Sequence, residues 1–273
     1  MTATLADMHT HSRHSPDSTC DMEAMCLSQL EKGTRIFAVT DHFDGFAFEE
    51  RDLFTPIKQS YDEVMRLRER YGDRCLLLAG VEIGEGFWHA EPYRQIRDLL
   101  PYDVIIGSVH CVKHPTHSEP YSMIDFSAFD EREIAAYLDR YFDDLITTVE
   151  QIDFDILAHL NCPLRYINGK YRRAATLEAF QGKIRTVLSR VIERGLALEV
   201  NTSGFLSLGE PMPNASILQT YFDMGGRRVT LGSDAHVSEH ASAGFARAVS
   251  LLKEVGFDEI CRFEQRKVNT VRI

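Results

Sequence analysis

Histidine and carboxylate residues follow short apolar segments along the 273-residue chain. The first motif is His9-Thr10-His11, whose two rings point to the same side of an extended strand because side chains alternate with a period of two. The later positions are His42, Glu82, His110, His159, Asp234 and His236. Imidazole and carboxylate groups are the ligands that zinc, iron and manganese use in proteins. The pattern therefore predicts a metal site assembled from distant parts of the chain.

Six histidines with Glu82 and Asp234 are more ligands than a single ion needs. A set of this size suits two or three ions that share a bridging carboxylate. Two-metal sites stabilise the attacking and leaving oxygens of an in-line displacement at phosphorus, and they lower the pKa of bound water. Each motif alone could be a helix cap or a loop residue. Its recurrence after six of seven apolar segments favours a metal-dependent hydrolase.

The elements that must position these residues are seven apolar segments, each followed by a segment of helical length. We expect strands at Thr4–Met8, Arg35–Thr40, Cys75–Ile83, Asp103–Val109, Phe154–Leu160, Leu196–Asn201 and Arg228–Gly232. We expect helices at Met22–Lys32, Ile57–Arg70, Tyr93–Leu100, Glu131–Gln151, Thr176–Arg194, Asn214–Met224 and Ala241–Val255. Continuously apolar strands are typical of parallel sheets that are buried on both faces.

Seven such units predict an α/β fold, a closed or nearly closed TIM-like (βα)7 barrel that forms a single domain over residues 1–273. Active sites of βα barrels lie at the C-terminal ends of the strands, where the ligand-type residues stand in this sequence. A doubly wound open sheet is the alternative. No glycine-rich dinucleotide motif follows the first expected strand, which weakens that alternative.

The composition argues against several other classes of protein. The chain has 30 Lys and Arg against 41 Asp and Glu, a formal net charge of −11. Nucleic-acid polymers and anionic membranes are bound through clustered basic residues, so neither is an expected partner. The composition is compatible with a small-molecule anionic substrate in a locally positive pocket. Six scattered cysteines, no secretory signal and no apolar run of about 18 residues predict a cytoplasmic protein. The oligomeric state is left open.

The ordered motifs resemble the PHP family (polymerase and histidinol phosphatase), whose members are metal-dependent phosphoesterases on a distorted seven-stranded βα barrel. The family pattern of His-x-His, Thr-Asp-His, an internal Glu, two further His and a terminal Asp-x-His occurs here in order. The segments that most resemble the histidinol-phosphate phosphatase branch are 9–12, 40–44, 107–110, 164–166, 199–204 and 231–236.

The resemblance implies a trinuclear site of zinc, iron or manganese ions. Its ligands fall into three sets, which are His9, His11, Glu82 and Asp234 for the first ion, Glu82, His110 and His159 for the second, and Asp17, His42 and His236 for the third. Asp17 stands six residues after His11, where the family places an Asp, Glu or His. Glu82, His236 and Asp17 are the expected catalytic residues.

A phosphate ester also needs a cationic contact, and the family's Arg-Tyr pair matches Arg165-Tyr166. The planar guanidinium of Arg165 suits two-point contact with a phosphate group, so Arg165 is the predicted substrate-binding residue. The chain departs from the branch at Phe205-Leu206, where an Arg is common. A replacement contact could come from Arg13, Lys113, Lys170 or Arg172.

The activity that the resemblance implies is hydrolysis of L-histidinol phosphate to L-histidinol and phosphate in histidine biosynthesis, through in-line attack by a metal-bridging hydroxide. The choice of general acid stays open between Asp44 and Asp17. The polar loop Lys113–Phe126, which includes His114 and His117, is expected over the barrel mouth, where it could contribute substrate-selecting groups.

Three alternatives remain. The chain could be a PHP phosphoesterase that acts on another phosphomonoester or on a nucleotide phosphodiester, which the Phe205-Leu206 departure favours. It could be an amidohydrolase, a class that also begins with His-x-His, but His110 stands where a bridging Lys is usual. It could also be a non-catalytic metal-binding module, although every expected ligand type is present.

Overall fold

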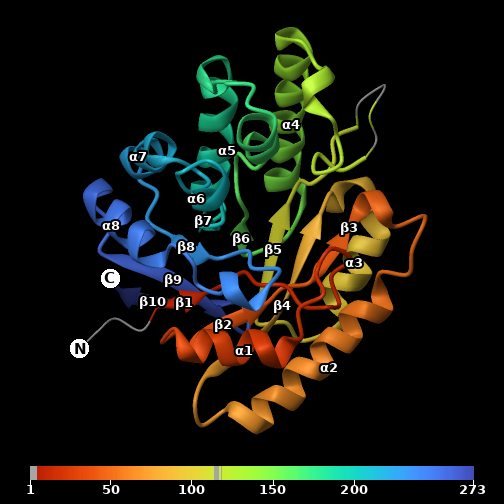
Figure 1. Cartoon of the computed structure of the whole chain (residues 1–273), viewed down its shortest axis with the longest axis vertical. Helices are drawn as coiled ribbons and strands as arrows, with labels where there is room; N and C mark the ends of the chain where they lie inside the picture. Colours follow the sequence, from red (N-terminus) through yellow and green to blue (C-terminus); the bar gives the residue numbers. More distant parts are fainter. Residues whose placement is uncertain (1–4, 114–116, 118) are drawn as a thin grey trace.

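The computed structural model describes residues 5–113, 117 and 119–273, and it places short parallel strands inside a shell of helices (Figure 1). The strands of the main sheet are β1 (Ala6–Asp7), β2 (Ile36–Val39), β3 (His42–Asp44), β4 (Leu76–Gly84), β5 (Val104–Ser108), β6 (Ile156–Leu157), β7 (Ala197–Asn201) and β8 (Val229–Gly232). Nearly all their residues are buried, as expected for strands covered on both faces. Thr4, where the first strand was expected to begin, lies outside the described residues.

Parallel pairing closes seven of these strands into a barrel. The order is β2-β1-β8-β7-β6-β5-β4, and β4 pairs with β2 to complete the ring. The first half of β4 lies beside β2 and its second half lies beside β3, so β3 continues the interrupted β2 along the same neighbour. The predicted seven-stranded βα barrel is therefore confirmed, and the open-sheet alternative is wrong.

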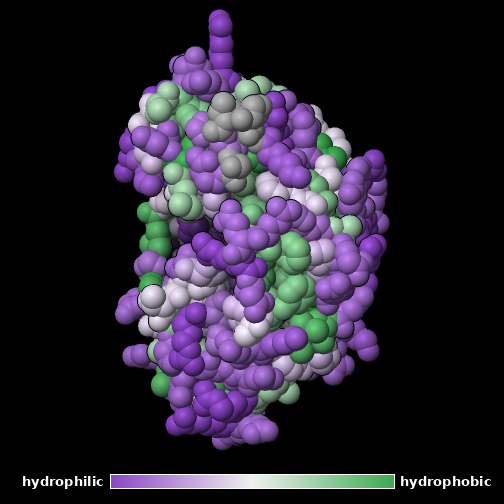
Figure 2. All heavy atoms as spheres, turned by 90° about the vertical axis from the view of Figure 1, so that its right-hand side faces the viewer, coloured by the Kyte–Doolittle hydropathy of each residue, from purple (hydrophilic) through white to green (hydrophobic). Residues whose placement is uncertain are grey.

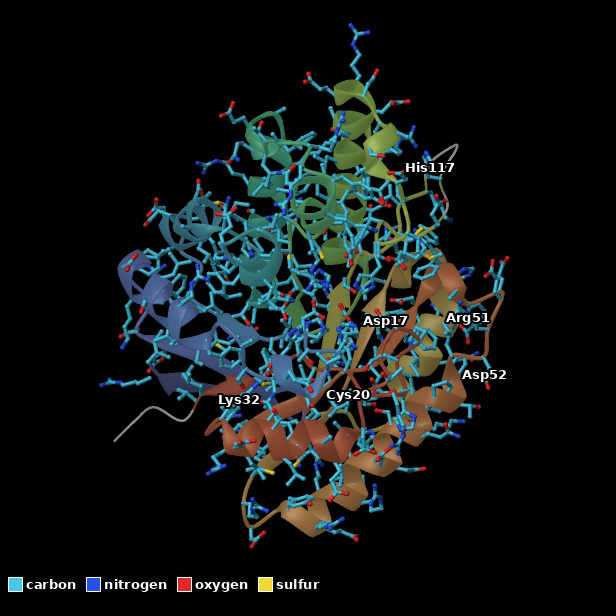
Figure 3. The ribbon with its side chains drawn as sticks, in the orientation of Figure 1. Asp17, Cys20, Lys32, Arg51, Asp52 and His117 are labelled. Atoms are coloured by element: carbon cyan, nitrogen blue, oxygen red, sulfur yellow. The ribbon has the colours of Figure 1, made fainter. Side chains whose placement is uncertain are left out.

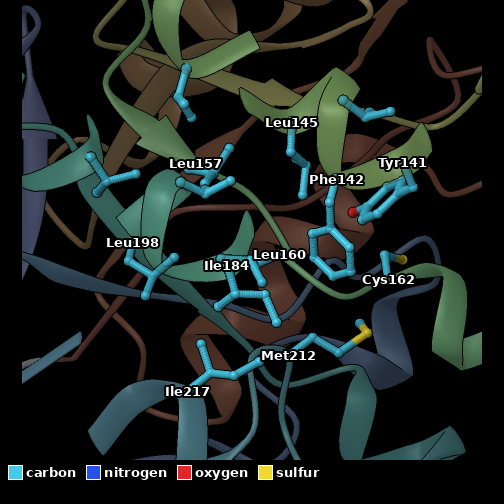
Figure 4. Packing of buried hydrophobic residues seen from close by; sticks show 14 of the residues in the cluster. Tyr141, Phe142, Leu145, Leu157, Leu160, Cys162, Ile184, Leu198, Met212 and Ile217 are labelled. Atoms are coloured by element: carbon cyan, nitrogen blue, oxygen red, sulfur yellow. The ribbon is translucent and has the colours of Figure 1, made fainter. Parts of the chain in front are cut away.

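The helices surround this barrel. They are α1 (Met22–Glu31), α2 (Phe54–Tyr71), α3 (Ala90–Leu99), α4 (Glu131–Gln151), α5 (Gln181–Glu193), α6 (Gly204–Ser207), α7 (Ala215–Asp223) and α8 (Phe245–Val255). Figure 4 shows part of the apolar layer beneath them, where Phe142, Leu145 and Ile184 pack with Leu157 of β6 and Leu198 of β7. Full burial contributes about 1.5–3 kcal/mol for each side chain of this size.

Two helices begin at least four residues later than the sequence predicts. The segment expected as a helix from Thr176 contains a 3-10 turn at Glu178–Phe180 before α5 begins. The helix expected from Ala241 begins at Phe245. Gly244, the residue before α8, has a φ of 79°, a left-handed conformation that glycine adopts at little cost and that interrupts any helix passing through it.

The N-terminal half of the barrel interior is filled by apolar side chains. This apolar floor consists of Ala6, Met8, Ala38, Leu78, Val104, Ile106, Ile156, Ala158, Ala197, Cys261 and Phe263. Cys261 and Phe263 come from β9 (Glu259–Glu264), which forms an antiparallel hairpin with β10 (Lys267–Arg272). The turn of this hairpin binds Asp103, just before β5, through the backbone N–H groups of Gln265 and Arg266. The hairpin, which the sequence analysis does not predict, therefore covers the N-terminal end of the barrel.

The surface in Figure 2 is mostly hydrophilic, in line with the acidic composition. None of the helices in the described ranges has both the length and the apolar character needed to cross a membrane.

Candidate metal centre

The barrel interior changes from apolar to polar toward the C-terminal ends of the strands. Leu78 of β4 belongs to the apolar floor, and Glu82, four residues later on the same face, is fully buried among histidines. On β7 the same change runs from Ala197 to Glu199. Residues two or four positions apart on a strand lie on the same face, so β4 and β7 each contribute to both layers.

The first predicted ligand set is compact. Nε2 of His9 lies 3.0 Å from Nε2 of His11 and 3.1 Å from Oε2 of Glu82. Oδ1 of Asp234 lies 3.4 Å from Nε2 of His11 and 3.8 Å from Nε2 of His9. Four donor atoms, from the segment after β1, from β4 and from the segment after β8, therefore meet in one small volume.

The second oxygen of Glu82 faces the second predicted set. Oε1 lies 3.0 Å from Nε2 of His159 and 3.2 Å from Nε2 of His110, and the two ring nitrogens are 3.3 Å apart. The two oxygens of Glu82 thus face different groups of histidines, which is the arrangement that a bridging carboxylate requires.

The third predicted set lies nearest to solvent. Oδ2 of Asp17 is 3.2 Å from Nε2 of His236, and Oδ1 is 3.6 Å from Nε2 of His42. The Asp17 side chain is 58% exposed. Figure 3 shows it close to the centre of the molecule, while Arg51 and Asp52 lie farther out, before α2. The rings of His42 and His236 both stack on His11, with centroid distances of 4.3 and 4.1 Å, so the third set adjoins the first.

The donor atoms of the three sets fit divalent metal ions. A tetrahedral zinc ion with bonds of about 2.0–2.1 Å keeps its ligand atoms about 3.4 Å apart. The separations given above run from 3.0 to 3.8 Å. Nε2 of His236 is buried and close to Asp17, yet it makes no aligned hydrogen bond to any described residue. The lone pair of this nitrogen, which lies beside a carboxylate, is available to a cation.

The charges in this polar layer depend strongly on one another. Burial opposes protonation of His9, but the carboxylates of Glu82 and Glu199 raise its pKa well above the usual value. Burial and the neighbouring His236 lower the pKa of His11 to about 3, so the ring of His11 stays neutral. Ligands must be deprotonated to bind a metal, so a bound ion would replace the additional proton of His9.

Oxygen atoms behind two of the histidines fix which ring nitrogen faces the centre. Nδ1 of His110 donates to Oδ1 of Asp44 at 2.9 Å, and Nδ1 of His11 lies 3.0 Å from Oγ of Ser15. A ring that donates from Nδ1 keeps the lone pair of Nε2 for a metal. The sequence analysis considers Asp44 only as a general acid. Its place two residues after His42, on the same strand face, could have indicated a contact with the ligands.

A cavity of about 480 Å³ opens onto the polar layer, and Asp17, Asp234 and His236 line it together with Arg165. Arg165 begins a π-helical turn, Arg165–Lys170. Its Nη1 lies 3.2 Å from Oδ2 of Asp234, and this ion pair holds the guanidinium on the cavity wall. The predicted substrate-binding residue and the predicted metal ligands therefore share one cavity.

The loop after β5 forms another part of the cavity wall, as the sequence analysis expects. Residues 120–123 line the cavity, and the backbone N–H of Tyr121 donates to the carbonyl of His110 at 3.0 Å. His117 lies 3.2 Å from a carboxylate oxygen of Glu119. His114 lies outside the described residues.

Phe205 and Leu206, where the chain departs from the pattern of the branch, do not line the cavity. Phe205 packs beneath the guanidinium of Arg247, 4.0 Å from ring centroid to Cζ. None of the four replacement cations considered from the sequence lines the described part of the cavity, and Arg13 is paired with Asp21 and Glu63. The second cation on the described wall is Arg51, which the sequence analysis misses because no motif marks it.

Comparisons with known proteins identify the family of this chain. The family model described as PHP domain matches residues 7–203, which include every predicted ligand except Asp234 and His236. A probable histidinol-phosphatase of Thermotoga maritima is 28% identical over 271 residues, covering 98% of this chain and 100% of that protein. A histidinol-phosphatase of Lactococcus lactis is 25% identical over 265 residues, covering 96% of each chain.

A solved structure shares the fold. The crystal structure of histidinol phosphate phosphatase from Lactococcus lactis, complexed with zinc, L-histidinol and phosphate, matches with a TM-score of 0.80 at 22% identity. The match covers 97% of this chain and 99% of that one. Since the family model spans well over half of the sequence, the protein belongs to the PHP domain family.

Proposed function

We propose that the protein is a metal-dependent phosphomonoesterase that hydrolyses L-histidinol phosphate to L-histidinol and phosphate. The observation that carries this proposal is the meeting of three His and carboxylate sets around Glu82, next to a cavity whose wall holds Arg165. Divalent cations and a guanidinium together match the charge of a phosphate ester. The similarity to histidinol-phosphatases over the whole chain supports this substrate.

Two or three zinc, iron or manganese ions would bind to the nine predicted ligands, which are His9, His11, Asp17, His42, Glu82, His110, His159, Asp234 and His236. Ions bound there lower the pKa of water and offset the charge of a phosphoryl group. Glu82 holds two ligand sets at a fixed separation through its two oxygens. Asp17 and His236 line the cavity, so we assign them, with Glu82, to the groups that act on the substrate.

The cavity supplies the remaining contacts. Asp234 orients the guanidinium of Arg165, which would bind two phosphate oxygens at once. Phe46, Tyr121 and Tyr166 also line the cavity, and aromatic rings suit both the imidazole ring and the ammonium group of histidinol. A volume of about 480 Å³ accommodates a ligand of this size.

A second candidate function is phosphoesterase activity on another phosphomonoester or on a nucleotide phosphodiester. Arg51 is the observation that favours it, because this guanidinium lines the cavity. A cation there would attract a second anionic group of a substrate and would repel the ammonium group of histidinol phosphate.

We also propose that residues 1–273 act as one PHP-type phosphatase domain. The main apolar cluster contains residues from Phe43 to Ile260, so most of the chain shares one core. A cytoplasmic location is proposed on the sequence alone.

A substrate panel tests the proposed function. The protein, loaded with manganese or zinc, is given L-histidinol phosphate, a sugar phosphate, a nucleoside monophosphate and a nucleotide phosphodiester. Steady-state rates are measured as phosphate release for the three monoesters and as formation of the nucleoside monophosphate for the diester. We expect kcat/KM for histidinol phosphate to exceed the others by about a hundredfold or more, about 2.7 kcal/mol of discrimination. Equal rates across the panel would reject the histidinol assignment, and no turnover of any ester would reject the phosphatase.

A further inference from the structure

We infer that Glu199 is a positioning residue that sets the geometry of the first and second predicted metal sites together, an inference that rests on the proposed function. Glu199 lies on β7 and is 1% exposed. It is not one of the nine predicted ligands. Both of its carboxylate oxygens are occupied by groups that belong to, or adjoin, those ligands.

Oε1 of Glu199 holds the imidazole ring of His9 in position. Nδ1 of His9 donates to this oxygen at 2.6 Å, a short charge-assisted contact between two buried groups. Nε2, at the other side of the ring, faces His11, Glu82 and Asp234. A carboxylate that holds the Nδ1 proton both orients the ring and keeps Nε2 free to bind a metal.

Oε2 of Glu199 holds the backbone of His159 in position. The backbone N–H of His159 donates to this oxygen at 2.8 Å. The φ of His159 is 21°, a backbone conformation that residues other than glycine rarely adopt and that needs support from its surroundings. This conformation places the ring so that Nε2 lies 3.0 Å from Oε1 of Glu82. Glu199 thus stabilises an unusual backbone at a ligand of the second set.

A polar ladder along β7 extends the same support to Asp234. The side chains of Glu199, Asn201 and Ser203 occupy alternate positions. Nδ2 of Asn201 donates to Oε2 of Glu199 at 3.0 Å, while Oδ1 of Asn201 accepts hydrogen bonds from the backbone N–H and the hydroxyl of Ser203. Oγ of Ser203 lies 3.3 Å from Oδ2 of Asp234. Glu199 and Asn201 of β7, together with Ser203 just after the strand, therefore link three predicted ligands that come from three other parts of the chain.

The neighbouring strand leaves space for Glu199. A Cβ atom at Gly232 of β8 would lie 2.1 Å from Oε1 of Glu199 and 2.8 Å from Cβ of His9. No side chain fits there unless the contact between these two residues opens. The position of Gly232 is a second, independent sign that the Glu199–His9 pair needs this arrangement.

The donors around Glu199 show why its charge matters. Nδ1 of His9, the N–H of His159 and Nδ2 of Asn201 all point at its two oxygens. In Glu199→Gln one acceptor becomes an NH2 group, so at least one of these three donors meets another donor. A buried donor without an acceptor is unfavourable, and the ring of His9 or the backbone of His159 has to move.

The experiment compares metal binding by the full chain and its Glu199→Gln and Gly232→Ala variants. Zinc affinity is measured by competition with a chromophoric chelator, and cobalt(II) is used to record the visible spectrum of the bound ion, without substrate in either case. Asp155→Asn is the matched control. Asp155 is a buried carboxylate at the opposite end of the barrel, where it accepts from the N–H of Ile105 at 2.8 Å and from Arg266.

We expect Glu199→Gln to weaken binding of the ions held by the first two sets about 10- to 100-fold and to shift the cobalt(II) spectrum. Gly232→Ala should change binding in the same direction. Asp155→Asn should lower the melting temperature of the protein while leaving both metal readouts unchanged. Wild-type metal affinity and an unshifted spectrum in Glu199→Gln would overturn the inference, whatever its melting temperature.

The same measurements separate this inference from the proposed function. The wild-type protein could bind metal but hydrolyse no phosphate ester, while Glu199→Gln weakens metal binding as stated. This result would reject the proposed function and support the positioning role. A wild-type protein that binds no ions would overturn both.

Discussion

The two ends of the barrel are built from the same strands but have opposite chemistry. At the N-terminal end, the interior side chains are those of the apolar floor, and Phe263 of the hairpin closes it. At the C-terminal end, the same strands carry buried histidines and carboxylates such as His9, Glu82 and Glu199. On β7 a single residue separates Ala197 of the floor from Glu199 of the polar layer.

This difference means that the N-terminal end mainly stabilises the fold, whereas the C-terminal end carries the groups that bind metal and substrate. Burial of charged groups is unfavourable unless they are paired or bind a metal, so the polar layer depends on the apolar regions for its stability. The floor and the outer apolar layer supply that stability. Changes at the C-terminal end should therefore affect metal binding and activity most, and changes at the N-terminal end should affect folding most.

Glu82→Gln should have the largest effect, because it removes the charge that both the first and the second ligand sets share. We expect kcat/KM for phosphate release to fall by at least about a thousandfold, about 4 kcal/mol of transition-state stabilisation. Metal analysis of the dialysed variant should show fewer bound ions per chain. A variant that keeps its secondary structure and more than a tenth of wild-type activity would break the proposed division.

Phe263→Ala tests the other end of the barrel. Phe263 is 4% exposed in the apolar floor, and truncation of a buried Phe costs about 3–5 kcal/mol. Denaturant unfolding should show this loss, while zinc affinity of the folded variant stays at the wild-type value. Val268→Ala, a change at a 37% exposed position on β10 of the same hairpin, is the control and should cost less than about 0.5 kcal/mol. Loss of metal binding in folded Phe263→Ala would show that the two ends are coupled.

Arg165→Lys separates substrate binding from metal binding within the C-terminal end. Lysine keeps the positive charge but loses the planar two-point contact with phosphate. We expect kcat/KM to fall about 10- to 100-fold, about 1.4–2.7 kcal/mol, with an unchanged number of bound ions. Arg172→Lys, at an exposed residue that does not line the described part of the cavity, should stay within about twofold of wild type by the same criterion. Equal effects of the two changes would contradict the role of Arg165.

Asp144 of α4 belongs to neither end and should produce a small pH effect on stability. Burial, together with the nearby Asp143, raises the pKa of this half-buried carboxyl to about 6. Its folded-state pKa exceeds the unfolded value of about 3.9, so the native state binds more protons between these values and stability falls as pH rises toward 6.

Asp144→Asn removes this titration. Allowing for partial solvent exposure, we expect the variant to be about 1 kcal/mol more stable than wild type at pH 7.5 and equally stable at pH 3.5. Paired urea titrations at the two pH values measure the difference. A gain of the same size at both pH values would show that packing, and not ionisation, is responsible.

Much of the barrel and its candidate site can be predicted from the sequence. Continuous apolar runs mark strands buried on both faces, and their number indicates closure into a barrel. Ligand-type residues immediately after these runs indicate one common face, so the proximity of His9, Glu82 and His236 follows from topology before any distance is known.

The C-terminal hairpin could not be predicted in the same way. Its turn residues, Gln265 and Arg266, have φ values of 52° and 59°, a conformation usually marked by Asn or Gly. Here the turn is held instead by distant contacts, from the backbone of both residues to Asp103 and from the Arg266 side chain to Asp155. Local sequence carries no signal for such tertiary support.

The residues behind the ligands were missed for a related reason. Glu199 stands on an expected strand, but its contact with His9 spans 190 positions in the sequence. Only the closed ring, in which β7 and β1 flank β8, brings the two together. Arg51 depends on the path of the segment before α2, for which the sequence has no comparable pattern.

In our proposal, the C-terminal end of the barrel is a multi-ion metal centre that catalyses phosphate release. The most direct test is titration of metal-free protein with zinc or manganese, with bound ions per chain and phosphate release from L-histidinol phosphate measured on the same samples. We expect no turnover without metal and a rise in activity that reaches its plateau at two to three bound ions. Full activity in the metal-free protein, or a plateau at a single ion, would contradict it.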